Sequence, residues 1–267
     1  MKDKKRILFA LCISISSITM AVFSQAPPGA KDRKEAIQNN GDELIAIDVL
    51  LEPDETLIRK SRAVGALLQQ RLQSGPELVA SHPHITLLQR FVRAKDLDAV
   101  AAALAKVLIA KRLENLRLKT KDYGYESWEG GAVTIIAVER TPELMRLHRM
   151  VVDAVEPFSV NGGTAAAFAA RKIDPVTISY VETFVPESSG DNYAPQVVAG
   201  IAGEGFAKRV KAEPYHPFTF KADGVAVYQL GKFGVAAKKL WSWTPMNDRP
   251  NSFRQISGAR GSSRDSG

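Results

Sequence analysis

The chain has 267 residues, of which 45% are hydrophobic and 24% are charged, and it carries a formal net charge of +7 and a single cysteine. This apolar content is sufficient for a sizeable folded core. The cysteine, Cys12, lies in an apolar N-terminal run, so the rest of the chain can form no disulfide, thiolate zinc site or thiol nucleophile. The mild basic excess permits an anionic ligand without requiring nucleic acid.

The first 24 residues have the pattern of a secretory signal peptide. A basic start at residues 2–6 precedes the uncharged run Ile7–Phe23, and small residues surround the expected cleavage point after Ser24. We therefore expect an exported protein, periplasmic or secreted, with no stable membrane partner after cleavage. The alternative is an uncleaved anchor, because the apolar run is close to the shortest length that spans a bilayer.

Two further segments differ in composition from the rest. Residues 25–41 are polar, contain Pro and Gly, and indicate a linker. Residues 245–267 are rich in Ser, Gly and Arg, which is typical of a disordered tail. Residues 42–244 are left as the folded domain.

Hydrophobic periodicity and turn residues predict the elements of this domain. Ile45, Ile47, Val49 and Leu51 alternate as on one face of a strand, and Asp54 is a plausible cap of the helix that follows. In chain order we expect a strand at 44–51, a helix at 54–75, a strand at 81–92, a helix at 97–113, strands at 116–125 and 133–138, a helix opened by Thr141-Pro142, a helix or strand at 177–184, a strand at 196–202, a helix at 203–210, and a hairpin of 218–220 and 225–230 turned at Asp223-Gly224.

Strands in this order occur both singly and in hairpins. That mixture favours an α+β protein of two similar lobes over a doubly wound parallel sheet.

The stretch SHPHITLLQR, residues 81–90, carries two of the four histidines. On a strand His82, His84 and Thr86 would share one face, while Ile85 and Leu87 would point into the core. The imidazole of His84 and the hydroxyl of Thr86 could then hold one oxyanion together, and the imidazole could transfer a proton near neutral pH. The alternative is a surface strand end without a chemical role.

Three segments together resemble the 2H phosphoesterase superfamily, which includes 2′-5′ RNA ligase and cyclic phosphodiesterase proteins. His84-Ile85-Thr86 resembles its first His-x-Thr motif, NYAPQVVAGIA at 192–202 resembles the frame of the second motif, and PFTFKADGVAVYQLGKFG at 217–234 resembles its closing strands. The resemblance covers about residues 43–240.

The resemblance implies an α+β fold of two pseudo-symmetric lobes, with antiparallel sheets that flank a central cleft. It implies a phosphodiester or nucleotide-like ligand, such as a cyclic 2′,3′-phosphate, a 2′-5′-linked oligonucleotide or an RNA end, and it implies neither a cofactor nor a metal. In such a site one histidine accepts a proton from the attacking group, and the other donates a proton to the leaving oxygen.

The second motif departs from the family pattern. Gln196 stands in the place of the second histidine, and Val198 stands in the place of the second threonine. A glutamine amide can bind a ligand by hydrogen bonds but cannot exchange a proton near pH 7. We therefore expect His84 and Thr86 to be the catalytic half of the site, Gln196 to contact the substrate, and the phosphodiesterase activity to be weak or altered. The alternative is an inactive binding or interaction protein on the same fold.

The remaining histidines fit structural positions better than a second catalytic site. His82 is expected at the rim of the site, His148 in the apolar stripe of its helix, and His216 in a turn before Pro217. His82 and His84 also lack an obvious third ligand, so no metal site is predicted.

Overall fold

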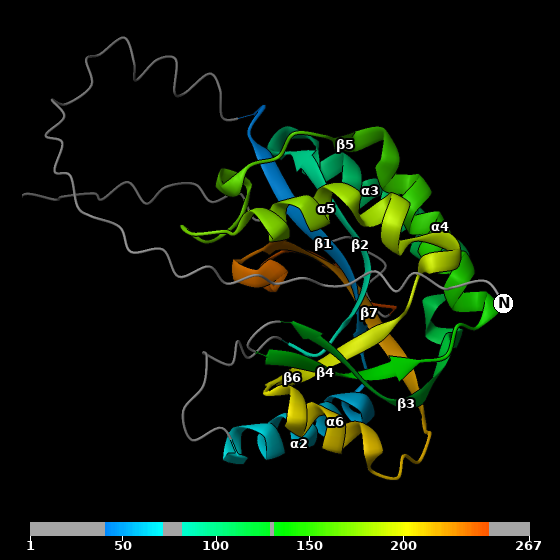
Figure 1. The fold of residues 1–267 in the computed structure, drawn as a ribbon. Coiled ribbons are helices and arrows are strands. Elements are labelled where there is room, and N and C mark those ends of the chain that lie inside the picture. The colour runs from blue at the N-terminus through cyan, green and yellow to red at the C-terminus, as the bar shows by residue number, and fades with distance from the viewer. Residues whose placement is uncertain (1–40, 72–81, 129–130, 246–267) are drawn as a thin grey trace, which may run out of the picture.

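The computed structural model describes residues 41–71, 82–128 and 131–245. The predicted signal peptide, nearly all of the predicted linker, the helix end at Gly75-Pro76 and nearly all of the C-terminal tail lie outside these residues. Within them the fold is α+β: one open sheet of eight strands, in which every pairing is antiparallel, together with five α-helices (Figure 1).

Hydrogen-bonded neighbours in the sheet follow the order β5-β2-β1-β7-β3-β4-β6, and β8 also pairs with β7. The first part of β7 pairs with β3 and its second part pairs with β8, while β1 pairs along most of its length. The strand bounds are β1 Leu44–Pro53, β2 Ile85–Arg93, β3 Arg117–Trp128, β4 Gly131–Val138, β5 Ser159–Val160, β6 Gln196–Ala202, β7 Thr219–Leu230 and β8 Ala236–Trp243.

The helices form two groups, one near each end of the sheet. Helices α2 and α6 pack against β6, β3 and β4, whereas α3 and α4 pack together and α4 and α5 contact β2 (Figure 1). The helix bounds are α2 Glu55–Arg71, α3 Leu97–Lys111, α4 Pro142–Val155, α5 Pro175–Ser188 and α6 Glu204–Ala212.

Strand β1 confirms the predicted alternation. Ile47, Val49 and Leu51 are fully buried in the main hydrophobic core, and Ile45 packs against it. The opposite face of β1 is buried as well, and it carries the carboxylate of Asp48 at 0% exposure. A charged side chain in the interior of a strand requires polar partners, because an unpaired buried charge is strongly destabilising.

Side-chain caps begin three of the helices. The Asp54 carboxylate accepts hydrogen bonds from the backbone N–H groups of Thr56 and Leu57, and the Thr141 hydroxyl accepts one from Leu144, as the sequence predicted. Asp174 caps α5 in the same way, through the N–H of Thr177. Residues 177–184, for which the sequence allowed either a helix or a strand, are therefore part of this capped helix.

The predicted hairpin at Asp223-Gly224 is wrong. Residues 219–230 form the single strand β7, because pairing with β1 resumes at Ala222 on the far side of Asp223, which is an extra residue at a register shift. A Cβ atom on Gly224 would lie 2.6 Å from the carbonyl oxygen of Trp243, so the glycine accommodates the close approach of another strand end. The strand β8 that ends at Trp243 was not predicted.

The strand predicted at 81–92 begins later than expected. Strand β2 starts at Ile85, so His82 and His84 lie in the segment that leads into it. Pro83 lacks the backbone N–H that a paired strand residue donates, which explains the late start.

None of the helices in the described ranges is long and apolar enough to cross a membrane.

Candidate functional site

The His84 side chain lies at the entrance to β2 and is 13% exposed. Its Nδ1 atom is 2.6 Å from the carbonyl oxygen of His82, and since a carbonyl only accepts, Nδ1 carries a hydrogen. Its Nε2 atom lies 3.5 Å from Oδ2 of Asp48. The ring is thus fixed at one nitrogen by the backbone and approached at the other by a carboxylate.

Asp48 joins the two residues of the first motif. Besides His84, its Oδ2 atom receives hydrogen bonds from the Thr86 hydroxyl at 3.2 Å and from the Gln89 amide at 3.3 Å. Thr86 therefore directs its hydroxyl hydrogen at Asp48, and it would have to turn away in order to donate to a ligand. His84, just before β2, and Thr86 on β2 reach the same carboxylate, so the two side chains point to the same side although only Thr86 belongs to the strand.

Asp48 is the group that most favours the protonated form of His84. Burial alone would lower the pKa of the imidazole, but the hydrogen-bonding and electrostatic effects of Asp48, with smaller ones from the His82 carbonyl and Glu52, together raise the pKa of His84 above its ordinary value. His82 differs: it is exposed, and partial burial with the neighbouring cations holds its pKa below the usual value. The exposure of His82 is compatible with a place at the rim of the site, which stays a prediction.

Sequence analysis did not identify Asp48 as part of the site. The signal that could have found it is the position of a carboxylate between apolar residues on both faces of β1, in the sequence AIDVLL. Such a carboxylate needs a buried partner, and a histidine on a neighbouring strand is a suitable one.

The edge of β2 is held by two aromatic rings. The pairing with β1 shifts between Val49 and Leu50, which leaves Leu87 as an extra residue in β2. The Tyr193 hydroxyl donates to the carbonyl of Thr86 at 2.9 Å, and Nδ1 of His148 lies 2.9 Å from the carbonyl of Leu87. These carbonyls are consecutive, so the tyrosine and the histidine fix the backbone next to Thr86.

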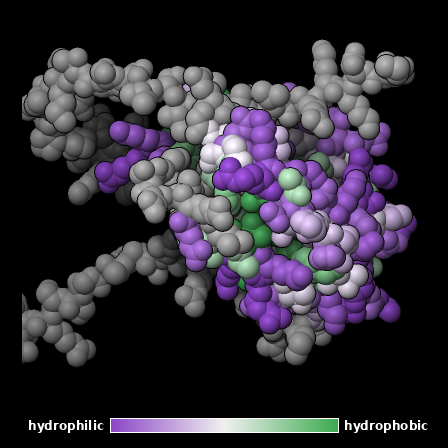
Figure 2. All heavy atoms as spheres, turned by 60° about the horizontal axis from the view of Figure 1, so that its bottom comes forward, coloured by the Kyte–Doolittle hydropathy of each residue, from purple (hydrophilic) through white to green (hydrophobic). Residues whose placement is uncertain are grey.

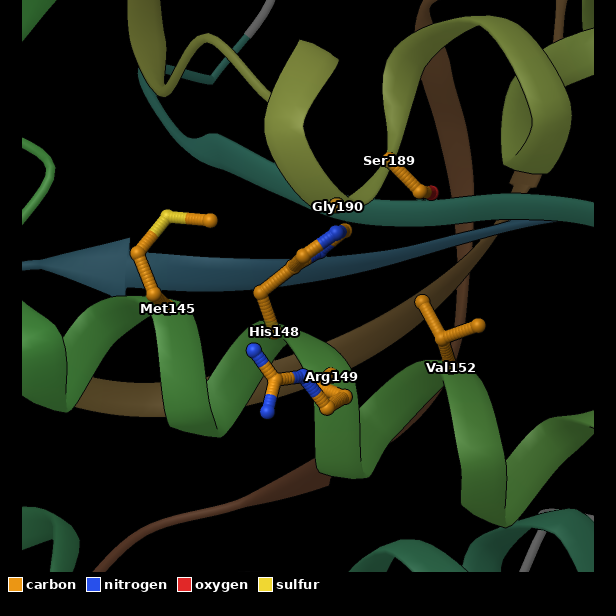
Figure 3. Close-up of a pocket in the computed structure, with 6 residues that line it drawn as sticks. All are labelled: Met145, His148, Arg149, Val152, Ser189 and Gly190. Carbon is orange, nitrogen blue, oxygen red and sulfur yellow. The ribbon is translucent and has the colours of Figure 1, made fainter.

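His148 is buried at 1% exposure, as predicted for a core residue. Its Nε2 atom and the hydroxyl of Ser189 have no hydrogen-bond partner in the described part of the chain. Both residues line a pocket of about 60 Å³, together with Gly190 and with Met145, Arg149 and Val152 of α4 (Figure 3). Binding pockets for nucleotide-sized ligands are several times larger, so this space suits a few water molecules.

Gln196 and Val198 lie on β6, whose bounds agree with the predicted strand. They pair with Ala137 and Ile135 of β4 and, being two residues apart, point to the same face of the sheet. Gln196 is half-buried, and its amide makes no hydrogen bond to another described residue, including His84 and Thr86. Strands β2 and β6 nevertheless approach one another.

Val198 is 40% exposed, which is unusual for a large hydrophobic residue of this protein. Figure 2 shows one face of the molecule, on which hydrophilic residues (purple) surround a smaller group of hydrophobic residues (green). Elsewhere in the described chain only Ile109 and Val176 expose a comparable apolar side chain. A residue facing solvent from β6 is available for contact with a ligand.

Other polar groups do not form a second centre. His216 is exposed, and among the residues that the structure describes, no group of three or more His, Cys, Asp and Glu could hold a metal ion. Tyr123 packs edge to face against Tyr215, with ring centroids 4.7 Å apart, which is a packing role.

Comparison with models of protein families gave no match, and comparison with curated proteins gave none.

Proposed function

We propose that the chain is an exported 2H phosphoesterase-like protein of the 2′-5′ RNA ligase and cyclic phosphodiesterase type, with two pseudo-symmetric lobes around a central cleft. It binds a phosphodiester or nucleotide-like anion through His84 and Thr86, with Gln196 on the facing strand, and it turns over weakly. The observation that carries this proposal is the state of His84: its ring is held by a backbone carbonyl and its pKa is raised by Asp48.

A protonated imidazole suits the first half of this chemistry. Its Nε2 hydrogen can bond to an anionic phosphate oxygen or be donated to the leaving oxygen. The approach of β2 and β6 supports a ligand held between the two motifs. Since Gln196 cannot accept a proton near pH 7, the reaction lacks its second proton-transfer group, which typically contributes about 10²–10⁴ in rate.

The second candidate is a binding protein without turnover. It is favoured by the Thr86 hydroxyl, whose hydrogen is directed to Asp48 and not to the open side of the site. It is also favoured by Val198, because a methyl group in place of a hydroxyl gives a phosphate oxygen no donor.

Calorimetry with adenosine 2′,3′-cyclic monophosphate tests ligand binding, and an assay for the opened monophosphate tests turnover. We expect binding by the natural protein, a loss of tenfold or more in affinity for His84→Ala, and no change for His216→Ala, an exposed histidine that serves as control. Absence of binding would refute the ligand assignment. Hydrolysis that His84→Ala leaves unchanged would show that the site is elsewhere.

Export is tested separately by mass spectrometry of the purified protein. We expect the N-terminus to follow Ser24; an intact Met1 in the membrane fraction would instead establish the anchored form.

A further inference from the structure

Asp48 is a carboxylate with no exposed surface, in the interior of β1. The three side chains around it, His84, Thr86 and Gln89, all meet its Oδ2 atom, while Oδ1 has no hydrogen-bond partner in the described ranges. Burial of a carboxylate is unfavourable unless an opposite charge lies near it. Among the described residues, His84 is the basic side chain that lies within ion-pairing distance.

The geometry of the His84 ring leaves Nε2 available. With a hydrogen already on Nδ1, a second hydrogen on Nε2 makes the ring cationic. The distance of 3.5 Å from Nε2 to Asp48 is longer than the 2.7–2.9 Å of a charge-assisted hydrogen bond. The carboxylate therefore stabilises the cation without fully occupying the Nε2 hydrogen, which can also reach a ligand oxygen.

We propose that Asp48 is a positioning residue of this site: it keeps His84 in the imidazolium form and holds the Thr86 hydroxyl, so that the site presents a fixed cation to a phosphodiester. The ligand in this statement rests on the proposed function, whereas the effect of Asp48 on His84 does not.

Other charged groups near His84 are less able to set its protonation. Glu52 also favours the cation, but it forms an ion pair with Lys239, 2.6 Å away. His82 lies beside His84, but Lys239, Arg62 and His84 itself oppose a positive charge on His82, so its own pKa is lowered.

The aromatic groups near Asp48 are neutral. Burial raises the pKa of the Tyr180 and Tyr193 hydroxyls far above their usual range, so neither tyrosine supplies a charge near pH 7. Asp48 is thus the group that both contacts His84 and carries the required charge.

Nuclear magnetic resonance of the imidazole, recorded against pH on the whole protein, tests the proposal. We expect His84, assigned by the loss of its signals in His84→Gln, to titrate above the ordinary value of about 6.5. In Asp48→Asn, which keeps the shape of the side chain, the titration should move to lower pH. Glu52→Gln is the matched control and should move it less.

Two results would overturn the proposal. One is a natural protein in which His84 titrates at or below the ordinary value, a result that does not depend on Asp48→Asn and holds even if that variant does not fold. The other is a folded Asp48→Asn that leaves the titration unchanged, or a Glu52→Gln whose effect is as large.

Affinity for adenosine 2′,3′-cyclic monophosphate, measured against pH, provides the second readout. The natural protein should lose affinity as pH rises through the His84 titration, and Asp48→Asn should lose affinity at lower pH. At pH values between the two titrations, Asp48→Asn should bind about tenfold more weakly than the natural protein. If His84 titrates as expected but the nucleotide does not bind at any pH, the proposed ligand is wrong and the role of Asp48 in fixing the cation stands.

Discussion

The imidazole of His148 is stacked on the phenol ring of Tyr193, with ring centroids 3.8 Å apart and ring planes 2° from parallel. His148 comes from α4, and Tyr193 lies just before β6. Each bonds to one of two consecutive carbonyls of β2. The stack therefore connects the two strands that carry the motif positions.

Tyr193→Phe should destabilise the protein moderately. It removes the hydrogen bond to the Thr86 carbonyl but keeps the stacked ring, so we expect a loss of about 0.5–1.5 kcal/mol in the free energy of unfolding. Urea denaturation measures this value. Tyr125→Phe is the control, because the Tyr125 hydroxyl forms no hydrogen bond within the described part of the chain. Equal costs for the two variants would show that the bond to Thr86 contributes nothing.

His148 should make the protein sensitive to acid. Burial is the main effect that lowers its pKa, so the folded state binds a proton less readily than the unfolded chain, in which the ring titrates near 6.5. Stability should consequently decrease as pH falls from about 6.5 towards the lower folded pKa. His148→Gln keeps a donor for the Leu87 carbonyl but cannot titrate. From pH 7.5 to pH 5.5, the free energy of unfolding should therefore decrease more for the natural protein than for this variant. Equal decreases for the two proteins would contradict the prediction.

Replacement of glycine by alanine should lower the stability of the protein at one position and raise it at another. Gly224→Ala places a methyl group 2.6 Å from the Trp243 carbonyl oxygen, and forcing these strands apart should cost about 1–3 kcal/mol. Gly205 lies in α6, and the nearest atom to an added methyl is the end of the Arg209 side chain, 4.0 Å away. Gly205→Ala should therefore stabilise the protein by up to about 1 kcal/mol. Thermal or urea unfolding measures both, and destabilisation by both variants would disprove the difference in local packing.

Introducing on β6 the two residues that the proposed 2H phosphoesterase site lacks should raise activity. The double substitution Gln196→His with Val198→Thr supplies a second proton-transfer group and a second hydroxyl, each on the side of β6 that now carries Gln196 and Val198. We expect hydrolysis of a nucleoside 2′,3′-cyclic phosphate to rise by about 10²-fold or more. The same double substitution with His84→Ala should abolish the gain. An unchanged rate would show that the face of β6 and His84 do not act on one phosphate.

Much of the fold could be predicted because the determining signals are local. The alternation in β1, the caps at Asp54 and Thr141 and the bounds of β6 depend on residues within a few positions of each other. The turn at Asp223-Gly224 was mispredicted because its local preference is overridden by pairing with β1, whose residues are far away in sequence.

The candidate site could be predicted only in half. His84 and Thr86 form a recognisable short pattern, whereas Asp48 contributes through a contact between two strands, and no local spacing encodes it. The same holds for Tyr193, which reaches Thr86 across the fold. These partners become apparent only when the register of β1 and β2 is known.

The unbroken course of β7 has a mechanical consequence. Because β3 pairs with residues 219–221 of β7 and β1 pairs with residues 222–229, this one strand joins the β1–β2 part of the sheet to the β3–β4–β6 part. Any change in the separation of β2 and β6 within the sheet would therefore be transmitted through β7, and most directly through the register shift beside Asp223.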